Sequence, residues 1–184
     1  MRIESLRPRF RLFIPLATFM LIGIFLFRAL SINPMSIPSA MVGRSLPTFE
    51  LPVLETGSLA NHEDLIGRSI LINVWATWCA ACIVEHPFLM ELAEAGILIY
   101  GINYKDQASN AKRWLLDYGN PYVSNIVDQD GRLGIDLGVY GAPETFFVDA
   151  NGIIRYRHVG ILNEDIWASK LSMLYADLNI GEQN

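Results

Sequence analysis

Two short apolar runs, each followed by a helical pattern, constrain the fold of this chain more than any other feature. Residues 70–75 and 97–102 are nearly continuous runs of apolar side chains, which is typical of strands that are covered on both faces. Helical patterns follow at about residues 79–95 and 107–118, and each of them ends at a glycine. We therefore predict a parallel strand–helix–strand unit and an α/β fold.

Later segments extend this unit. Residues 145–149 and 153–159 flank Ala150-Asn151-Gly152 and predict an antiparallel hairpin, so the sheet should be mixed. A final helix at about 163–178 has its apolar residues on one stripe, and we expect it to cover the second face of the sheet. A unit of ~135 residues buries about two thirds of its unfolded surface without disulfide bonds, which leaves the two cysteines available for chemistry.

The N-terminal segment has the character of a membrane anchor. No charged side chain occurs in Leu12–Phe27, and the apolar stretch extended to residue 32 holds 21 residues, or ~31 Å of helix. Four arginines precede it and should stay cytoplasmic. We predict a cytoplasmic N-terminus at 1–11, a transmembrane anchor at 12–32, a linker at 33–45 and the exported domain at 46–184.

Two further observations bear on this organisation. A cleaved signal peptide is the alternative to an anchor, because Pro38-Ser39-Ala40 offers small residues, although this site lies 13 residues beyond Phe27. Residues 31–184 hold nine Lys and Arg against eighteen Asp and Glu, a net charge of −9, whereas residues 1–30 carry +4. The acidic domain is not suited to binding nucleic acid.

The two cysteines, Cys79 and Cys82, directly follow the first predicted strand and stand at the head of the next helix. Residues three apart share one helical face, so the thiols lie one turn apart and can form a disulfide. Unpaired N–H groups at a helix N-terminus favour a thiolate, which makes Cys79 the predicted attacking sulfur and Cys82 the resolving one. We predict redox chemistry at this disulfide, with no other cofactor.

Two alternatives compete with redox chemistry. Cys79, Cys82 and His86 share one helical stripe and could be metal ligands, but His86 lies ~10.5 Å along the helix axis from Cys79, beyond the reach of one ion. We therefore expect no metal. A purely structural disulfide is the other alternative, although a bridge that closes so short a loop restricts the unfolded chain little.

Three segments resemble a known family. Val74–Cys82 reads VWATWCAAC and resembles the strand-to-helix active site of thioredoxin-like proteins. Gly138–Phe146 reads GVYGAPETF and, with Asn103–Asp106, is similar to the cytochrome c maturation branch, the DsbE/CcmG-type thiol:disulfide interchange proteins. Leu51-Pro52, Ile37–Ala40 and the predicted anchor also match. The resemblance implies a thioredoxin-like fold, a central mixed β-sheet flanked by helices, with an N-terminal transmembrane helix.

The resemblance also implies substrate contacts near the cysteines. Pro143 stands where this fold carries a cis-proline that faces the disulfide, which would leave the backbone of Ala142 available to pair with an extended substrate; otherwise Pro143 is an ordinary turn proline. Trp78 is expected to form an exposed apolar rim beside Cys79, the alternative being a place in the core. Tyr140 belongs to the same expected substrate surface.

Glu85 and Glu144 match acidic positions of the family's active site. Glu85 lies three residues after Cys82, and Glu144 directly follows Pro143, where we expect its carboxylate beside the cysteines while Thr145 points the other way. A carboxylate near a thiol raises the pKa of that thiol and moves the couple toward a reductant. The alternative for each is a solvated surface glutamate.

Two positions depart from the family pattern. Ala81 replaces the usual proline before the second cysteine, and Ile83 replaces a basic residue after it, so the redox potential is not fixed by the resemblance. Because residue 83 is not histidine, the chain lacks the CxxCH motif of a c-type haem acceptor.

Together these features predict a reductant in the bacterial inner membrane, single-pass, with its C-terminal domain in the periplasm. The expected partners are apocytochrome c or its haem-ligation proteins as substrates and a membrane thiol carrier as electron donor. An oxidase or isomerase shares the fold and the cysteines and is the first alternative. A redox-silent module that docks apocytochrome or haem through residues 140–147 is the second.

Overall fold

The chain divides into two compact units, Met1–Ile37 and Pro38–Asn184. The structure, a computed structural model, describes residues 7–30 and 41–180. In the first unit, helix α1 (Arg7–Leu30) contains Pro15. Within the described ranges, no helix is both long enough and apolar enough to cross a membrane.

Parts of the predicted N-terminal organisation lie outside the described residues. These are residues 1–6 of the cytoplasmic segment, residues 31–32 at the end of the anchor, and residues 33–40 of the linker. The described part of the predicted linker, residues 41–45, lies within the second unit. The N–H of Gly43 donates to the carbonyl of Ile154 (2.7 Å), and the N–H of Ile154 donates to the carbonyl of Arg44 (2.9 Å). Residues 41–45 thus pair by their backbone with the strand that contains Ile154.

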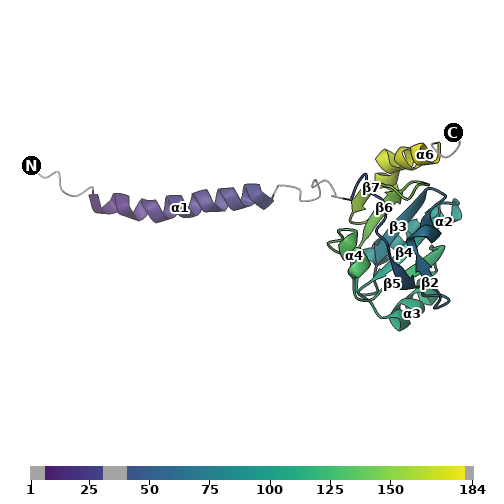
Figure 1. The fold of residues 1–184 in the computed structure, drawn as a ribbon. Coiled ribbons are helices and arrows are strands. Elements are labelled where there is room, and N and C mark those ends of the chain that lie inside the picture. The colour runs from purple at the N-terminus through teal and green to yellow at the C-terminus, as the bar shows by residue number, and fades with distance from the viewer. Residues whose placement is uncertain (1–6, 31–40, 181–184) are drawn as a thin grey trace, which may run out of the picture. The chain divides into compact units, whose positions relative to one another are not determined.

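A mixed five-stranded sheet forms the centre of the second unit, with the strands in the order β5-β4-β3-β6-β7 (Figure 1). Its strands are β3 (Ile70–Trp75), β4 (Ile99–Tyr104), β5 (Ser124–Asp128), β6 (Glu144–Val148) and β7 (Ile154–Val159). The first three run parallel, and β6 and β7 are antiparallel to their neighbours. The mixed α/β sheet expected from the sequence is confirmed. A separate antiparallel pair joins β1 (Glu50–Pro52) to β2 (Leu59–Asn61).

Helices cover this sheet. They are η2 (His62–Leu65), α2 (Ala80–Glu94), α3 (Ala108–Tyr118), α4 (Arg132–Asp136), α5 (Glu164–Ile166), a π-helical turn η3 (Trp167–Leu171) and α6 (Ser172–Ile180). Four residues separate the end of β3 from the start of α2, so the connecting turn stands at the carboxyl end of a central strand. Ligands and active sites of α/β sheets gather at this end.

Two apolar clusters pack on opposite faces of the sheet because side chains alternate along each strand. Leu71, Trp75 and Phe147 point into the cluster that contains both cysteines and residues of α2 and α3. Val74 and Phe146 point into the other cluster, with residues of α4 and of the segment 41–51.

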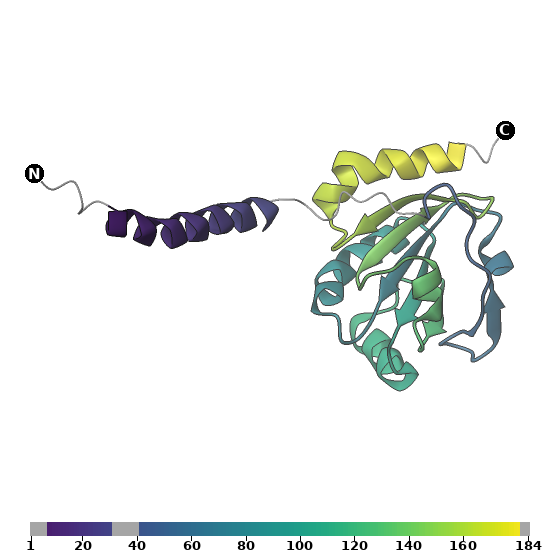
Figure 2. The same ribbon diagram turned by 60° about the vertical axis from the view of Figure 1, so that its left-hand side comes forward.

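The C-terminal helix does not cover the second face, and that expectation is wrong. Leu171 belongs to the cluster of the cysteines. The ring of Trp167 lies 6.2 Å from that of Phe147 in β6 and 6.4 Å from that of Phe88 in α2. The second face is already occupied by α4 and the segment 41–51. The apolar residues of the C-terminal helical segment therefore pack near β6 and β7, on the face that carries the cysteines (Figure 2).

Candidate active site

The disulfide stands at the start of α2. Cys79 is the N-cap residue of this helix, and Cys79 and Cys82 are joined by a disulfide with a Cα–Cα distance of 5.3 Å. The Sγ atom of Cys79 accepts a hydrogen bond from the backbone N–H of Cys82 (3.1 Å). The helix N-terminus therefore directs a donor at the sulfur predicted to attack, and such a donor favours a thiolate there. Both cysteines are almost completely buried.

Glu85 lies one turn beyond Cys82, and its side chain is buried, with 1% of the residue exposed. Its Oε1 accepts a hydrogen bond from the Asn73 side-chain amide (2.9 Å), and its Oε2 accepts one from the N–H of Leu162 (2.9 Å). Burial raises the pKa of the Glu85 carboxyl to about 7, although both hydrogen bonds favour the charged form. Glu85 can therefore gain or lose a proton near neutral pH, and it is not a solvated surface glutamate.

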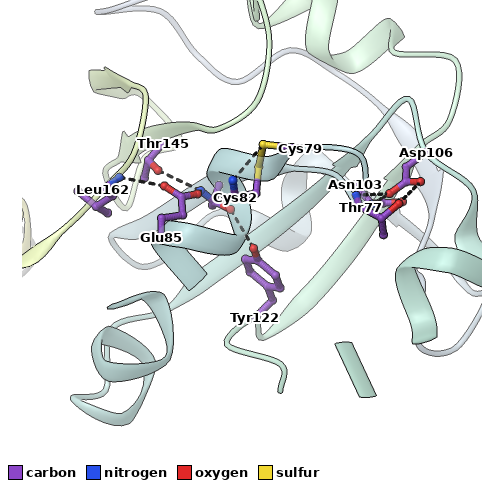
Figure 3. The surroundings of a disulfide bond; sticks show 10 residues. Thr77, Cys79, Cys82, Glu85, Asn103, Asp106, Tyr122, Thr145 and Leu162 are labelled. Atoms are coloured by element: carbon purple, nitrogen blue, oxygen red, sulfur yellow. Dashed lines mark hydrogen bonds between the residues drawn. A yellow bond between two sulfur atoms is a disulfide. The ribbon is translucent and has the colours of Figure 1, made fainter. Parts of the chain in front are cut away.

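Asn73 connects Glu85 to two more buried side chains. The Asn73 amide also donates to the Thr145 hydroxyl (3.1 Å), and its oxygen accepts from the Tyr122 hydroxyl (2.9 Å). Burial, followed by the charge of Glu85, raises the pKa of Tyr122 well above its ordinary value of 10, so Tyr122 stays a hydroxyl donor. Figure 3 shows Glu85, Thr145 and Leu162 on one side of the disulfide and Tyr122 below it.

Glu144 has a different environment from the one expected, and the prediction that its carboxylate lies beside the cysteines is wrong. Thr145 faces Glu85 and Asn73 on the face of the disulfide, so Glu144 faces the other side of the sheet. There its Oε2 lies 2.6 Å from Nη2 of Arg157 and accepts from Nε of the same residue (2.8 Å). Both side chains of this ion pair are buried.

The Glu144 carboxylate holds the loop that precedes it. Its Oε1 accepts hydrogen bonds from the N–H groups of Tyr140 (2.9 Å) and Gly141 (3.3 Å). The Tyr140 ring also lies 4.6 Å from Cζ of Arg157, within the range of a cation–π contact. The Ala142–Pro143 bond in this loop is cis, as the resemblance implied.

The two aromatic residues predicted to meet substrate are both at the surface. Trp78 is 55% exposed and Tyr140 is 75% exposed. The indole N–H of Trp78 donates to the carbonyl of Lys105 (3.0 Å), which fixes the edge of the ring while its face stays open. Trp78 is thus not a core residue. Its contact with a bound polypeptide stays a prediction, as do those of Tyr140, Ala142 and Pro143.

The residue that could have completed a metal site points elsewhere. The ring of His86 packs edge-on against that of Trp114, with 4.4 Å between ring centroids, and its Nε2 lies 3.2 Å from the carbonyl oxygen of Gly119. Burial lowers the pKa of His86, so its ring is neutral at pH 7. His86 is therefore engaged in core packing.

Comparison with known proteins places this site in a family. The Redoxin family model matches residues 41–178. A thiol:disulfide interchange protein DsbE from Pseudomonas fluorescens biotype C is 49% identical over 170 residues, which cover 92% of this chain and 96% of the relative. The chain belongs to the DsbE family of thiol:disulfide interchange proteins. It is a thiol:disulfide oxidoreductase with a thioredoxin-like fold.

Further relatives agree with this membership. The DsbE of Escherichia coli K12 is 44% identical over 171 residues, covering 89% of this chain and 92% of the relative. Among solved structures, a DsbE from Chlorobium tepidum superposes with a TM-score of 0.63 at 27% identity, over 74% of this chain and 97% of the other. The DsbE membership therefore covers nearly the whole chain.

The sequence predicted no role for several polar residues of this DsbE-family site, although Thr77 and Asp106 lie in segments that carry the resemblance: Thr77, Asn73, Asp106, Tyr122 and Arg157. Asn73 could have been found, because it is a polar residue within an otherwise apolar buried strand. Arg157 carried no such signal, since charged residues are common in a strand with one open face. Thr77 and Asp106 bond to each other across 29 residues, and Tyr122 bonds to Asn73 across 49 residues, so no local pattern indicates these contacts.

Proposed function

We propose that this chain is a membrane-anchored periplasmic reductant that acts on disulfides in apocytochrome c or in its haem-ligation partners. The observation that carries the proposal is the Cys79–Cys82 disulfide at the N-terminus of α2, with the buried carboxylate of Glu85 one turn further. The sequence segment GVYGAPETF, which resembles the cytochrome c maturation branch, supports this choice of substrate.

The reaction begins with the reduced dithiol. The Cys79 thiolate attacks one sulfur of the substrate disulfide, an S–S bond forms between enzyme and substrate, and one substrate thiolate leaves. The Cys82 thiolate then attacks Sγ of Cys79, which releases the second substrate thiolate and leaves the Cys79–Cys82 disulfide. Two electrons have passed from the enzyme dithiol to the substrate. A membrane thiol carrier, the electron donor in this proposal, returns the enzyme to the dithiol.

Glu85 acts on the proton of Cys82. A thiol buried in apolar surroundings has a raised pKa and needs a base before it can attack. With a pKa of about 7, the Glu85 carboxylate can take this proton at neutral pH. A neighbouring negative charge also disfavours the thiolate, which makes the dithiol the better electron donor. Helix α2 carries no Lys or Arg to oppose this effect.

Substrate binding involves the exposed surface around the disulfide. The rings of Trp78 and Tyr140 form its apolar rim, because both are exposed and each is held by a polar contact at one side. Ala142 and Pro143 lie between Tyr140 and strand β6, where an extended polypeptide could add alongside.

Membrane attachment rests on the N-terminal segment. The large apolar side chains of α1 between Phe13 and Phe27 are exposed on all sides of the helix, which is the character of a helix in lipid. The proposed span at 12–32 continues past the described end of α1. Carbonate extraction of cell membranes tests the anchor: the full chain should stay in the pellet, and a chain recovered in the soluble fraction would remove this part of the proposal.

A trapping experiment tests the reaction. In Cys82→Ser, a disulfide-bonded CxxCH peptide should form a stable mixed disulfide with Cys79, whereas Cys79→Ser should trap little. The full chain in detergent, equilibrated with glutathione, should have a potential more reducing than ~−180 mV, the value of a disulfide isomerase. A potential near ~−120 mV would identify an oxidant, and trapping through Cys82 would reverse the roles of the two sulfurs.

A further inference from the structure

Asp106, in the loop after β4, is a buried carboxylate that the proposed reaction leaves without a role. It is 7% exposed and accepts four hydrogen bonds. Its Oδ2 accepts from the N–H of Thr77 (2.6 Å) and from the Asn103 amide (3.1 Å). Its Oδ1 accepts from the Thr77 hydroxyl (2.8 Å) and from the N–H of Gln107 (2.8 Å). An amide side chain could not replace this pattern, because it has only one acceptor oxygen.

The neighbouring residue makes a second contact with the same turn. Lys105 has a φ of 48°, in the left-handed region that non-glycine residues rarely adopt. Its carbonyl accepts the indole N–H of Trp78 (3.0 Å), and its own N–H donates to the carbonyl of Asp128 (2.9 Å). Backbone in such a conformation persists only where surrounding contacts hold it. The pair Lys105 and Asp106 therefore holds both residues that precede Cys79.

These contacts lie beside the disulfide without touching either sulfur. Figure 3 shows Thr77, Asn103 and Asp106 on the opposite side of the disulfide from Glu85. The N–H of Cys79 donates to the carbonyl of Ala76 (3.2 Å), so the turn 76–79 is short and its orientation follows that of Thr77. A change at Asp106 should therefore move the attacking sulfur as a unit with this turn.

We propose that Asp106 is a positioning residue for thiol–disulfide exchange. By accepting two hydrogen bonds from Thr77, Asp106 holds the turn so that Sγ of Cys79 meets the substrate disulfide in one orientation. The proposal rests on the proposed function only in taking Cys79 as the attacking sulfur. Attack on a disulfide is directional, because the three sulfurs must align, and holding the reactants in that geometry lowers the barrier. The reaction of Sγ of Cys79 with a small alkylating agent depends less on the orientation of the sulfur.

The test compares these two reagents on the full chain in detergent. For Asp106→Asn, we expect the rate constants for exchange with glutathione disulfide to fall about tenfold in both directions. The equilibrium constant should then be unchanged, because positioning affects the transition state of both directions equally. The reaction of Cys79 with iodoacetamide, measured at a pH where the thiol is fully ionised, should change less than twofold.

Matched variants separate positioning from a general loss of structure. Asp149 is also 7% exposed and accepts hydrogen bonds from the N–H groups of Asn151 and Ile153, in the β6–β7 turn. Asp149→Asn should leave the exchange rates unchanged. Thr77→Val removes one hydrogen bond without altering charge and should slow exchange, whereas Thr77→Ser should restore it. The two Thr77 variants decide the matter if Asp106→Asn does not fold.

Three results would overturn the proposal. Exchange rates unchanged in Asp106→Asn or in Thr77→Val would remove the positioning role. A fall in exchange matched by an equal fall in alkylation, or a shifted equilibrium constant, would assign Asp106 an electrostatic effect instead. Equal slowing in Asp149→Asn would mean a general loss of structure. Alkylation mapping of the unaltered chain tests the proposed function separately. If Cys82 were labelled before Cys79, the assignment of Cys79 as the attacking sulfur would be wrong, whatever the exchange rates of the Asp106 and Thr77 variants.

Discussion

Two buried glutamates lie on opposite faces of the same sheet, and only one of them is paired with a cation. Glu85 faces the disulfide, accepts hydrogen bonds from neutral donors, and has a pKa raised to about 7 by burial. Glu144 faces away from the disulfide and is paired with the buried guanidinium of Arg157. Burial alone therefore does not decide what a carboxylate does, because the partners differ: neutral donors surround Glu85, whereas a guanidinium pairs with Glu144. Glu85 is suited to proton transfer and Glu144 to holding a loop.

Removing the guanidinium of Arg157 should have the largest effect of these changes on the free energy of unfolding. Arg157→Met leaves the buried charge of Glu144 without a cation, and we expect the free energy of unfolding to fall by about 3–5 kcal/mol at pH 7. Urea unfolding measures this loss. Arg155→Met is the control, because Arg155 is half exposed in its ion pair with Asp149 and such a pair contributes at most ~1 kcal/mol. Similar losses in both variants would contradict the comparison.

Stability should depend on pH through Glu85. Because the folded chain binds this proton more tightly than the unfolded chain, stability is highest below about pH 4.5 and falls as the pH rises to about 7. At ~1.4 kcal/mol per pKa unit, the rise from 4.5 to about 7 corresponds to a loss of about 3 kcal/mol.

Unfolding of the unaltered chain and of Glu85→Gln at pH 5 and pH 8 isolates this contribution. The variant should lack the Glu85 part of the pH-dependent loss, whereas Glu91→Gln, at an exposed position of the same helix, should retain it. An identical pH dependence in all three proteins would mean that Glu85 titrates at its ordinary value.

Only one of the two glutamates should influence the redox couple. Glu85→Gln removes a negative charge one turn from Cys82 and should make the potential at pH 8 more oxidising, by about 30 mV for each unit by which the thiol pKa falls. Glu144→Gln should leave the potential unchanged, because its charge lies on the other face and is paired. Equilibration with glutathione measures both, and a shift in the Glu144 variant alone would reverse the assignment.

The smallest effects concern the two tyrosines near these carboxylates. Tyr122→Phe leaves the buried Asn73 oxygen without its donor and should lower the free energy of unfolding by about 1 kcal/mol. Tyr140→Phe keeps the ring that stacks on Arg157 and should change stability by less than ~0.5 kcal/mol, because it alters an exposed position. Thermal unfolding of the two variants compares them, and an equal loss would mean that the Asn73 network contributes nothing measurable.

Local patterns in the sequence determined the redox centre. The apolar run before Cys79 predicts a buried strand, the following residues predict a helix, and a spacing of three residues places both sulfurs on one face of that helix. Each of these properties depends on residues close together in the chain. For the same reason, the burial of Glu85 on the Cys82 side of α2 agrees with its predicted place on that helical face.

Only the tertiary structure decided which carboxylate faces the disulfide and what surrounds it. Because side chains alternate along a strand, the placement of Glu144 depends on the register at which β6 pairs with β3, and a shift of one residue reverses the face. Arg157, Asp106 and the donor Leu162 reach the site from other strands and loops. Such contacts join segments far apart in the chain, so no local periodicity records them.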